Sequence, residues 1–293
     1  MYIEPKEATY EQFPASQLNA DGMITLNANF TNRYGMVDLN VEYAVKDRYP
    51  LHLQILRPPF QDEDTRFPLI MYIQGSAWFK QQLGINFAPL LDFAKRGFVI
   101  AMVEYRPSTT AVFPAQVEDT KTATNFMITN AAKYNVDPEK IVVWGDSSGG
   151  HTASMVNVTS DEPPKLNVKA FVDYYGPSDI SRMNEHSSTM NHLNPDSPEG
   201  CLIGQVRVDE YPERVAPTIP MNYIKGKQRP QLIIHGDKDR LVPFHQSVIL
   251  YEALKAAGSE VEFYKLAGAD HGGSPFWSGD VLEIVEKFIR KWV

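Results

Sequence analysis

The ten residues 141–150, Ile-Val-Val-Trp-Gly-Asp-Ser-Ser-Gly-Gly, decide the fold expected for this chain. The apolar run 141–144 predicts a buried strand, and a helix-like segment follows Gly150. Between the two, Ser147 stands in a Gly-x-Ser-x-Gly pattern, whose glycines allow a tight turn and a close approach of strand and helix. This context is typical of a nucleophile elbow, with the Ser147 hydroxyl at a helix N-terminus above the sheet edge.

The same alternation of strand and helix extends on both sides of this segment. Short apolar runs, each closed by Gly or Pro, occupy residues 51–56, 69–73, 98–103, 141–144, 170–174, 232–234 and 261–266. Helical segments are expected at 116–134, 244–257 and around 281–292, where apolar residues recur with helical spacing. The pattern predicts an α/β fold, a mostly parallel central sheet with helices on both faces. In such sheets, catalytic and ligand-binding sites form at the C-terminal ends of the strands.

Two regions stand outside the alternation. Residues 1–45 are polar and irregular and are expected to form an N-terminal arm ahead of a domain that covers residues 46–293. Residues 178–229 contain several prolines and no clean period between two core strands. We expect this segment to be a small cap inserted into the domain.

The composition limits the kinds of partner. The 293 residues are 43% hydrophobic and 22% charged, as in an ordinary globular protein. The 28 basic and 36 acidic residues give a formal charge of −8, which disfavours nucleic acid and anionic membrane surfaces as partners. A small molecule is therefore the expected binding partner. The single cysteine, Cys201, excludes an internal disulfide and a metal site made of several thiolates. No metal and no cofactor are expected.

The expected location is the cytoplasm. Residues 1–20 contain four charged side chains and no unbroken apolar stretch, so they do not resemble a signal peptide. No stretch approaches the roughly 18 apolar residues that a membrane span needs. The sequence leaves open whether the chain forms a homo-oligomer.

A serine nucleophile needs a base, and His271 is the best candidate among the seven histidines. It lies in a loop after the last apolar run and before the final helix, so its ring can reach the C-terminal edge of the sheet. The chain order of serine, acid and histidine is then that of the hydrolases. The other histidines considered, His151, His235 and His245, are interpreted as packing or capping residues.

The acid that orients the histidine is expected directly after the run 232–234. Asp237 and Asp239 both lie there, in the segment His-Gly-Asp-Lys-Asp, and spacing alone does not separate them. The carboxylate of a triad fixes the tautomer of the histidine and stabilises the imidazolium that forms. Whichever aspartate is not catalytic is expected to cap the following helix.

An oxyanion hole is the remaining requirement for acyl transfer. The residue after the nucleophile, Ser148, is expected to supply one backbone N–H. The other donors should come from the loop after the run 69–73, which reads Gln-Gly-Ser-Ala-Trp over residues 74–78. Small side chains there would let the backbone approach a substrate.

Together these motifs resemble the hormone-sensitive-lipase-like branch of the α/β-hydrolases, which includes bacterial carboxylesterases, acetyl-xylan esterases and feruloyl esterases. The resemblance covers roughly residues 51–293. Besides the elbow, it is carried by Glu-Tyr-Arg at 104–106, Phe-Pro-Ala-Gln at 113–116, Asp-Tyr-Tyr-Gly-Pro at 173–177 and the acid loop at 235–243. In the family pattern the acid stands three residues before a Val-Pro pair, which favours Asp239.

The oxyanion loop departs from the family, which usually has His-Gly-Gly-Gly-Trp. By position, the resemblance implies that Ser76 and Ala77 are the donors. Their Cβ atoms occupy space that two glycines would leave open, so bulky substrates such as esters of tertiary alcohols are expected to fit poorly. The elbow has Ser148 where alanine is usual.

The resemblance implies a serine carboxylesterase acting on a small-molecule ester through an acyl-enzyme on Ser147. We expect short acyl groups, acetyl to butyryl, because Trp78, Phe276 and Trp277 are expected to border the cleft. The main alternative is an aminoacyl or peptidyl hydrolase, or an amidase, with the same triad. A prolyl-oligopeptidase-like enzyme would need a propeller domain that the residues before Leu51 cannot supply. A protein that only binds esters, without hydrolysing them, would usually lack a triad residue or the oxyanion loop, and this sequence has both.

Overall fold

The computed structural model describes residues 2–28, 34–59, 62 and 64–293. These residues belong to two compact units, residues 1–33 and residues 34–293. In the first unit, residues 2–28 form turns but no helix or strand, and their side chains are exposed.

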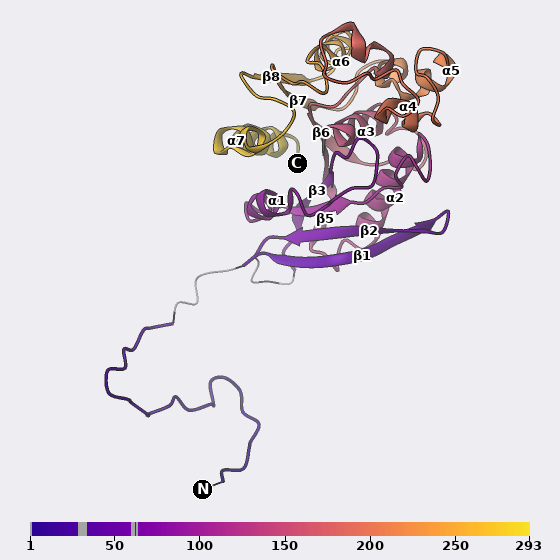
Figure 1. Ribbon diagram of the computed structural model, residues 1–293. Helices are drawn as coiled ribbons and strands as arrows, with labels where there is room; N and C mark the ends of the chain where they lie inside the picture. The colour runs from indigo at the N-terminus through magenta and orange to yellow at the C-terminus, as the bar shows by residue number, and fades with distance from the viewer. Residues whose placement is uncertain (1, 29–33, 60–61, 63) are drawn as a thin grey trace. The chain divides into compact units, whose positions relative to one another are not determined.

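The second unit is built on one sheet of eight strands in the order β1-β2-β4-β3-β5-β6-β7-β8 (Figure 1). Strands β3 to β8 are parallel, and β2 is antiparallel to both of its neighbours, β1 and β4. A parallel sheet requires crossover connections, and the helices between the strands supply them. The strands are β1 Met36–Lys46, β2 Tyr49–Arg57, β3 Phe67–Ile73, β4 Val99–Val103, β5 Val136–Asp146, β6 Val168–Tyr174, β7 Gln231–Gly236 and β8 Val261–Leu266.

Helices cover both faces of the sheet (Figure 1). Helices α1 (Phe87–Ala94) and α7 (Gly279–Trp292) pack on one face, and α2 (Ala115–Thr129), α3 (Ser148–Val158) and α6 (His245–Ala256) on the other. Each central strand is buried on both sides and contributes alternate residues to two separate cores. Among the described residues, no helix has both the length and the apolar character needed to cross a membrane.

The domain begins earlier than the sequence indicated. Residues 36–46 form β1, which pairs with β2 along its length, so the segment from residue 36 to 45 belongs to the sheet and not to an arm. This edge strand is irregular, with register shifts after Asp38 and Glu42, and most of its side chains stay partly or fully exposed. Its sequence has no continuous apolar run, but apolar and polar residues alternate from Val37 to Tyr43, the pattern of a half-buried strand. A prediction based only on continuous runs therefore misses β1.

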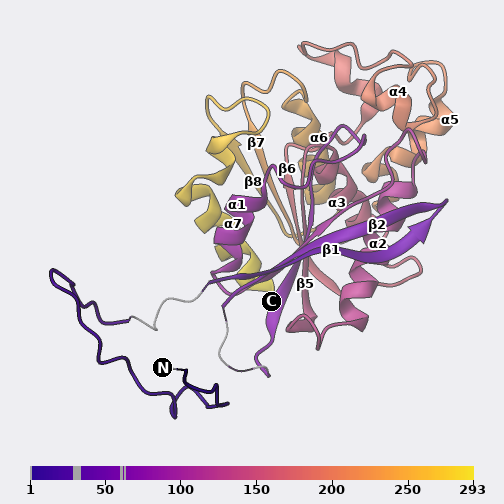
Figure 2. The same ribbon diagram turned by 60° about the horizontal axis from the view of Figure 1, so that its bottom comes forward.

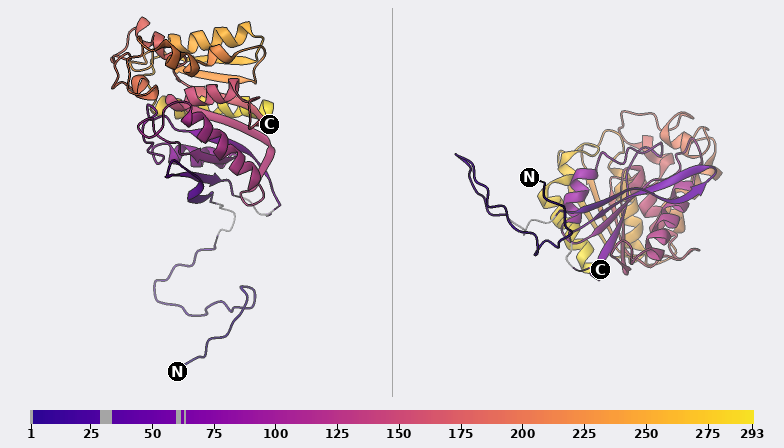
Figure 3. Two further views of the ribbon diagram at one scale, coloured as in Figure 1. Left: turned by 90° about the vertical axis from the view of Figure 1, so that its right-hand side faces the viewer. Right: turned by 90° about the horizontal axis from the view of Figure 1, so that it is seen from below.

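The segment between β6 and β7 contains only short helices, and it lies beyond one end of the sheet (Figures 2 and 3). It has a small core of its own, formed by Ile180, Leu202, Ile203, Val208 and Val215 around Trp78 from the loop after β3. This packing joins the cap to the loop expected to bind the oxyanion. Its helices are α4 Pro198–Leu202 and α5 Pro212–Val215, with 3-10 turns at Ile180–Glu185, Ala216–Thr218 and Pro220–Tyr223.

Candidate active site

Ser147 lies in the sharp turn that joins β5 to α3. Its backbone angles, φ 52° and ψ −126°, are unfavourable for a residue with a side chain, so the surrounding structure must hold them. The Ser147 N–H donates to the carbonyl of Tyr174 at 2.8 Å. A Cβ atom at Gly149 would overlap the carbonyl oxygen of Ile73, and one at Gly145 would overlap that of Gly149. The two glycines therefore permit the close strand–helix contact that presents the serine.

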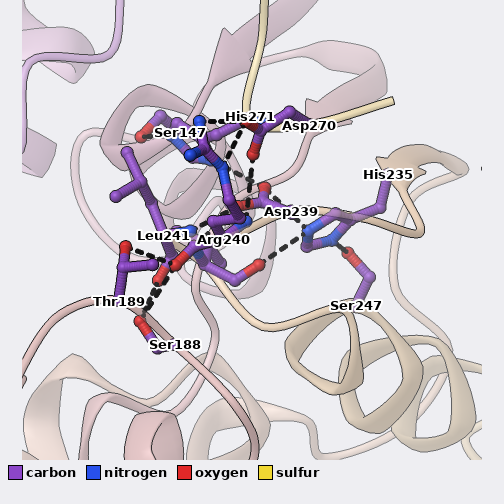
Figure 4. A network of polar contacts seen from close by, with 12 residues as sticks. Ser147, Ser188, Thr189, His235, Asp239, Arg240, Leu241, Ser247, Asp270 and His271 are labelled. Atoms are coloured by element: carbon purple, nitrogen blue, oxygen red, sulfur yellow. Dashed lines mark hydrogen bonds and ion pairs between the residues drawn. The ribbon is translucent and has the colours of Figure 1, made fainter. Parts of the chain in front are cut away.

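Three side chains from three loops form a continuous hydrogen-bonded row (Figure 4). The Nε2 atom of His271 lies 2.9 Å from Ser147 Oγ, and its Nδ1 atom lies 2.7 Å from Asp239 Oδ2. The three loops follow β5, β7 and β8, whose C-terminal ends lie at the same edge of the parallel sheet. This arrangement allows His271 to take the serine proton while the carboxylate fixes its orientation.

Asp239 is held as an anion by several donors. Its Oδ1 atom accepts the backbone N–H groups of Leu241 and Val242, at 2.9 and 2.8 Å. Burial alone would raise the pKa of Asp239, but hydrogen bonds from His235 and His271 outweigh it and hold that pKa well below its usual range. Asp237, two residues earlier, is exposed and accepts the Gly268 N–H instead. The structure thus brings Asp239 to the histidine and places Asp237 elsewhere.

The loop after β3 (the oxyanion loop, residues 74–78), which is expected to form the oxyanion hole, is shaped by side-chain hydroxyls. The N–H of Ser76 donates to Ser148 Oγ at 2.9 Å, and Ser76 Oγ lies 2.8 Å from Tyr105 Oη. Ala77 follows with φ 54°, a left-handed angle that favours glycine. The N–H of Ser148 is in the first turn of α3, where no intrahelical acceptor exists. Ala77 and Ser148 therefore offer N–H groups beside Ser147, whereas the N–H of Ser76 is engaged by the Ser148 hydroxyl.

A buried carboxyl, Asp146, ties this loop to the elbow. Its Oδ1 atom accepts from Tyr72 Oη at 2.6 Å and from the Gly75 N–H at 3.1 Å. Burial raises the pKa of Asp146, and these hydrogen bonds oppose the rise. Tyr175 packs edge-on against the His271 ring at 4.7 Å, and burial raises the pKa of its phenol well above the usual range. Neither residue is recognisable as part of the site from the sequence, because the contacts of Asp146 with Gly75 and of Tyr175 with His271 form only in the folded chain.

Two hollows meet at Ser147. One is a small pocket of about 100 Å³, lined by apolar groups including Trp78, Pro177 and Met190. The other is an open cleft of about 640 Å³. Trp277 lines this cleft, together with part of the oxyanion loop. Two further hollows have volumes of about 820 and 830 Å³. Ser147 lines neither of them, although Asp239 is among the residues around the second.

The aromatic residues expected at the cleft have different positions. Trp78 and Trp277 line the two hollows, but Phe276 is fully buried and lines neither. Its ring packs against Tyr175 at 4.4 Å, within the core under α7. The expectation that Phe276 borders the substrate is therefore corrected: as an apolar side chain on a 3-10 turn, it points into the core.

His151 on α3 holds the indole of Trp78 in place. Burial lowers the pKa of His151 to about 4, so the ring is neutral. Its Nε2 donates to the carbonyl of Thr218 in the cap at 2.7 Å, and its Nδ1 accepts from Trp78 Nε1 at 3.3 Å. The nucleophile helix, the oxyanion loop and the cap are thereby joined at one residue.

The donor set favours acid–base chemistry over metal binding. Within the described parts of the chain, no group of three or more His, Cys, Asp or Glu side chains is arranged to hold a metal ion. The polar groups at Ser147 comprise a hydroxyl, an imidazole, a carboxylate and backbone N–H groups, which together suit nucleophilic acyl transfer.

Comparisons with known proteins point in the same direction. A family model described as BD-FAE matches residues 53–254. Esterase LipQ of Mycobacterium tuberculosis is 27% identical over 250 residues, which are 82% of this chain and 58% of LipQ. Esterase LipC of the same organism is 28% identical over 70% of this chain and 53% of its own length. The chain thus spans little more than half the length of these curated relatives.

Solved structures share the fold. A truncated form of a carbohydrate esterase from gut microbiota is 30% identical, with a TM-score of 0.77, covering 89% of this chain and 97% of that one. Esterase 2 of Thermogutta terrifontis, solved with bound butyrate, is 25% identical with a TM-score of 0.68, covering 88% and 94%. The α/β-hydrolase fold expected from the sequence is confirmed.

Proposed function

Because the chain belongs to the BD-FAE family, we propose that it is a serine carboxylesterase that hydrolyses short acyl esters, acetyl to butyryl, through an acyl-enzyme on Ser147. One observation carries the proposal. The hydrogen-bonded row from Ser147 through His271 to Asp239 lies on a nucleophile elbow, and Ala77 and Ser148, whose backbone N–H groups would stabilise the oxyanion, line the small pocket beside Ser147. The esterase names of the relatives support the same reaction class.

In the first half of the reaction, Ser147 Oγ attacks the ester carbonyl carbon while His271 Nε2 takes the hydroxyl proton. The charge that develops on the carbonyl oxygen is stabilised by the N–H groups of Ala77 and Ser148. The N–H of Ser76 joins them only when Ser148 Oγ rotates away, because the two groups are hydrogen-bonded at rest. His271 then returns its proton to the alcohol oxygen, and the C–O bond of the ester breaks.

In the second half, a water molecule takes the place of the alcohol. His271 removes its proton, the hydroxide attacks the acyl carbon, and the carboxylic acid leaves as Ser147 regains a proton. The imidazolium that forms in each half is paired with Asp239, whose lowered pKa keeps it ionised throughout. The carboxylate therefore stabilises both proton transfers.

The acyl group occupies the small pocket and the alcohol occupies the open cleft. A pocket of about 100 Å³ between Trp78 and the cap suits a few methylenes, each contributing about 0.8 kcal/mol when buried. The wider cleft lets a larger alcohol leave to solvent. Butyrate bound to a structure 25% identical to this chain supports an acyl group of this size on the fold.

Replacing Ser147 with Ala tests the nucleophile. The kcat should fall by several orders of magnitude, as it does by about 10⁶-fold when a triad serine is removed from a well-studied protease. A fluorophosphonate probe should label the original protein and not the Ser147→Ala variant. Labelling that persists at Ser148 or Ser76 would contradict the assignment.

A series of p-nitrophenyl esters from acetate to palmitate tests the acyl size, with an aminoacyl p-nitroanilide beside it. The highest kcat/KM is expected between acetate and butyrate. A maximum at ten or more carbons would overturn the assignment of the acyl group to the small pocket. Dominant cleavage of the anilide would identify a peptidase or amidase in place of an esterase.

A further inference from the structure

A second histidine contacts the same carboxylate oxygen that orients His271. The Nε2 atom of His235 lies 3.1 Å from Asp239 Oδ2, the oxygen that His271 Nδ1 approaches at 2.7 Å. His235 is the penultimate residue of β7 and is fully buried. Figure 4 shows it on the side of Asp239 away from Ser147. From the sequence, this histidine is expected to be a packing or capping residue.

The hydrogen bonds fix which nitrogen of His235 carries a proton. Its Nε2 faces two acceptors, Asp239 Oδ2 and, at 3.0 Å, the carbonyl oxygen of Val242. Neither can donate, since Asp239 is ionised, so Nε2 must carry the proton. Its Nδ1 lies 2.7 Å from Ser247 Oγ on α6, a hydroxyl that can donate to it. The row Ser147–His271–Asp239 thus continues through His235 to Ser247.

We propose that His235 is a positioning residue for the reaction: it donates to Asp239 Oδ2 and thereby sets how strongly Asp239 binds His271. The inference rests on the proposed function. His235 lines neither of the hollows at Ser147, so it acts on the substrate only through the carboxylate. His235 and His271 both bind Asp239 Oδ2. The hydrogen bond from His235 therefore reduces the negative charge that this oxygen offers to the imidazolium of His271.

The lowered pKa of Asp239 supports this reading. Burial opposes ionisation, and among the groups that favour it, the hydrogen bond from His235 is the largest, ahead of that from His271. A residue that only filled space would leave the carboxylate with two backbone donors on Oδ1 and a single donor on Oδ2.

Other ionisable groups face the same site and are common to every variant. Tyr175 from the end of β6 stays neutral, because burial raises the pKa of its phenol. Asp146 from the end of β5 influences the histidine electrostatically, and burial raises its pKa. On the loops, the hydrogen bond from Arg240 lowers the pKa of Asp270 to about 2. A difference in pH profile between two variants at His235 therefore reports the change at that position.

The test compares His235→Leu with His235→Gln in the full chain, with p-nitrophenyl acetate as substrate. A fluorophosphonate titration counts active sites, so that kcat is expressed per folded molecule. The leucine removes the donor, whereas the glutamine amide can place an N–H where the ring nitrogen was. Without this donor the carboxylate loses one of the hydrogen bonds that fix its direction toward His271, and a misaligned imidazole transfers the proton less well. We expect this loss of alignment to outweigh the gain in charge, so His235→Leu should lower kcat by about 10-fold to 100-fold, with KM little changed.

The pH profile separates positioning from simple destabilisation. Without the His235 donor, Asp239 binds the imidazolium of His271 more strongly, so the acid limb of kcat/KM should move to higher pH in His235→Leu. The limb should stay in place in His235→Gln. Ser247→Ala, which removes a hydroxyl without touching Asp239, should shift the limb in the same direction by less, because the ring loses its alignment.

Two outcomes would overturn the inference. One is a His235→Leu variant with the original kcat per active site and an unmoved acid limb. The other is an equal loss in the leucine and glutamine variants without any shift, which would indicate a structural role only. An inactive original protein, or one that remains active as Ser147→Ala, would instead refute the proposed function, so the two failures are distinguishable.

Discussion

Two aspartates stand two residues apart in the loop after β7, and their surroundings give them different chemistry. Asp239 is buried and accepts from two histidines and two backbone N–H groups. Asp237 is exposed, and its Oδ1 accepts the N–H of Gly268. Spacing could not separate them, because the difference is which one the turn directs toward His271.

Asp239→Asn should therefore be far more damaging than Asp237→Asn. An asparagine at 239 can present an N–H to His271 Nδ1, which forces the wrong tautomer and should lower kcat by about 10⁴-fold, as in a protease triad. Asp237→Asn keeps a carbonyl acceptor for Gly268 and should stay close to the original activity. Steady-state kinetics of both variants checks this, and a deeper loss at 237 would contradict the assignment.

Ala77 is the second residue-scale feature, because it holds a left-handed φ of 54° in the oxyanion loop. A side chain there costs about 1 kcal/mol, which glycine would relieve. Ala77→Gly should leave the melting temperature unchanged or higher, and should raise the relative kcat/KM for tertiary-alcohol esters because the Cβ is gone.

The matched control is Ala253→Gly in α6, which should destabilise by about 0.5–1 kcal/mol because glycine is a poor helix former. Thermal unfolding of both variants gives the comparison. If Ala77→Gly loses as much stability as Ala253→Gly, the backbone at residue 77 is not strained.

At the scale of elements, the elbow depends on how closely α3 approaches β3. Any Cβ at Gly149 would overlap the carbonyl of Ile73, which is backbone and cannot rotate away. Gly149→Ala should therefore move the helix from the strand and displace Ser147. We expect loss of fluorophosphonate labelling and a large drop in melting temperature.

Gly279→Ala is the control for that substitution. Gly279 is the first residue of α7, and nothing lies within 4 Å of the position that its Cβ would take. This variant should keep full labelling and a melting temperature equal to or above the original. A Gly149→Ala protein that is labelled normally would show that the contact relaxes without cost.

At the scale of the whole molecule, stability should depend on pH through a buried carboxyl next to the elbow. Asp173 accepts from the Gly176 N–H at 2.9 Å and from Ser154 Oγ at 3.2 Å, and burial raises its pKa to about 7. In the unfolded chain an aspartate has a pKa of about 3.9. Between these values the folded state holds a proton that the unfolded state releases.

The sign of the pH effect follows from that difference. The contribution of Asp173 is fully present below about pH 4, is lost as pH rises toward 7, and amounts to at most about 4 kcal/mol. Asp173→Asn keeps an acceptor for Gly176 and cannot ionise. The free energy of unfolding of the original, relative to this variant, should therefore fall from pH 4 to pH 7 in denaturant titrations. A constant difference would contradict the raised pKa.

The local sequence was enough to predict most strands of the sheet and two of the residues in the candidate site. Seven apolar runs marked the strands β2 to β8. Strands β3 to β7 are buried on both faces of the sheet, so their sequences are almost continuously apolar, whereas β8 at the sheet edge is partly exposed. Ser147 and His271 could also be identified from the sequence. Ser147 lies in a glycine-rich turn directly after a strand and His271 in the loop after the last strand, and both positions are at the C-terminal edge of a parallel sheet. The exposed strand β1, which has no such run, was not identified.

Tertiary structure decided what depends on direction and on contacts between distant segments. It directed Asp239 rather than Asp237 to the histidine, placed Phe276 in the core, and engaged the N–H of Ser76 with the Ser148 hydroxyl. It also set His235 against the carboxylate that His271 uses. Side-chain direction in a loop is fixed by packing against residues far away in the chain, and residue order alone does not contain that information.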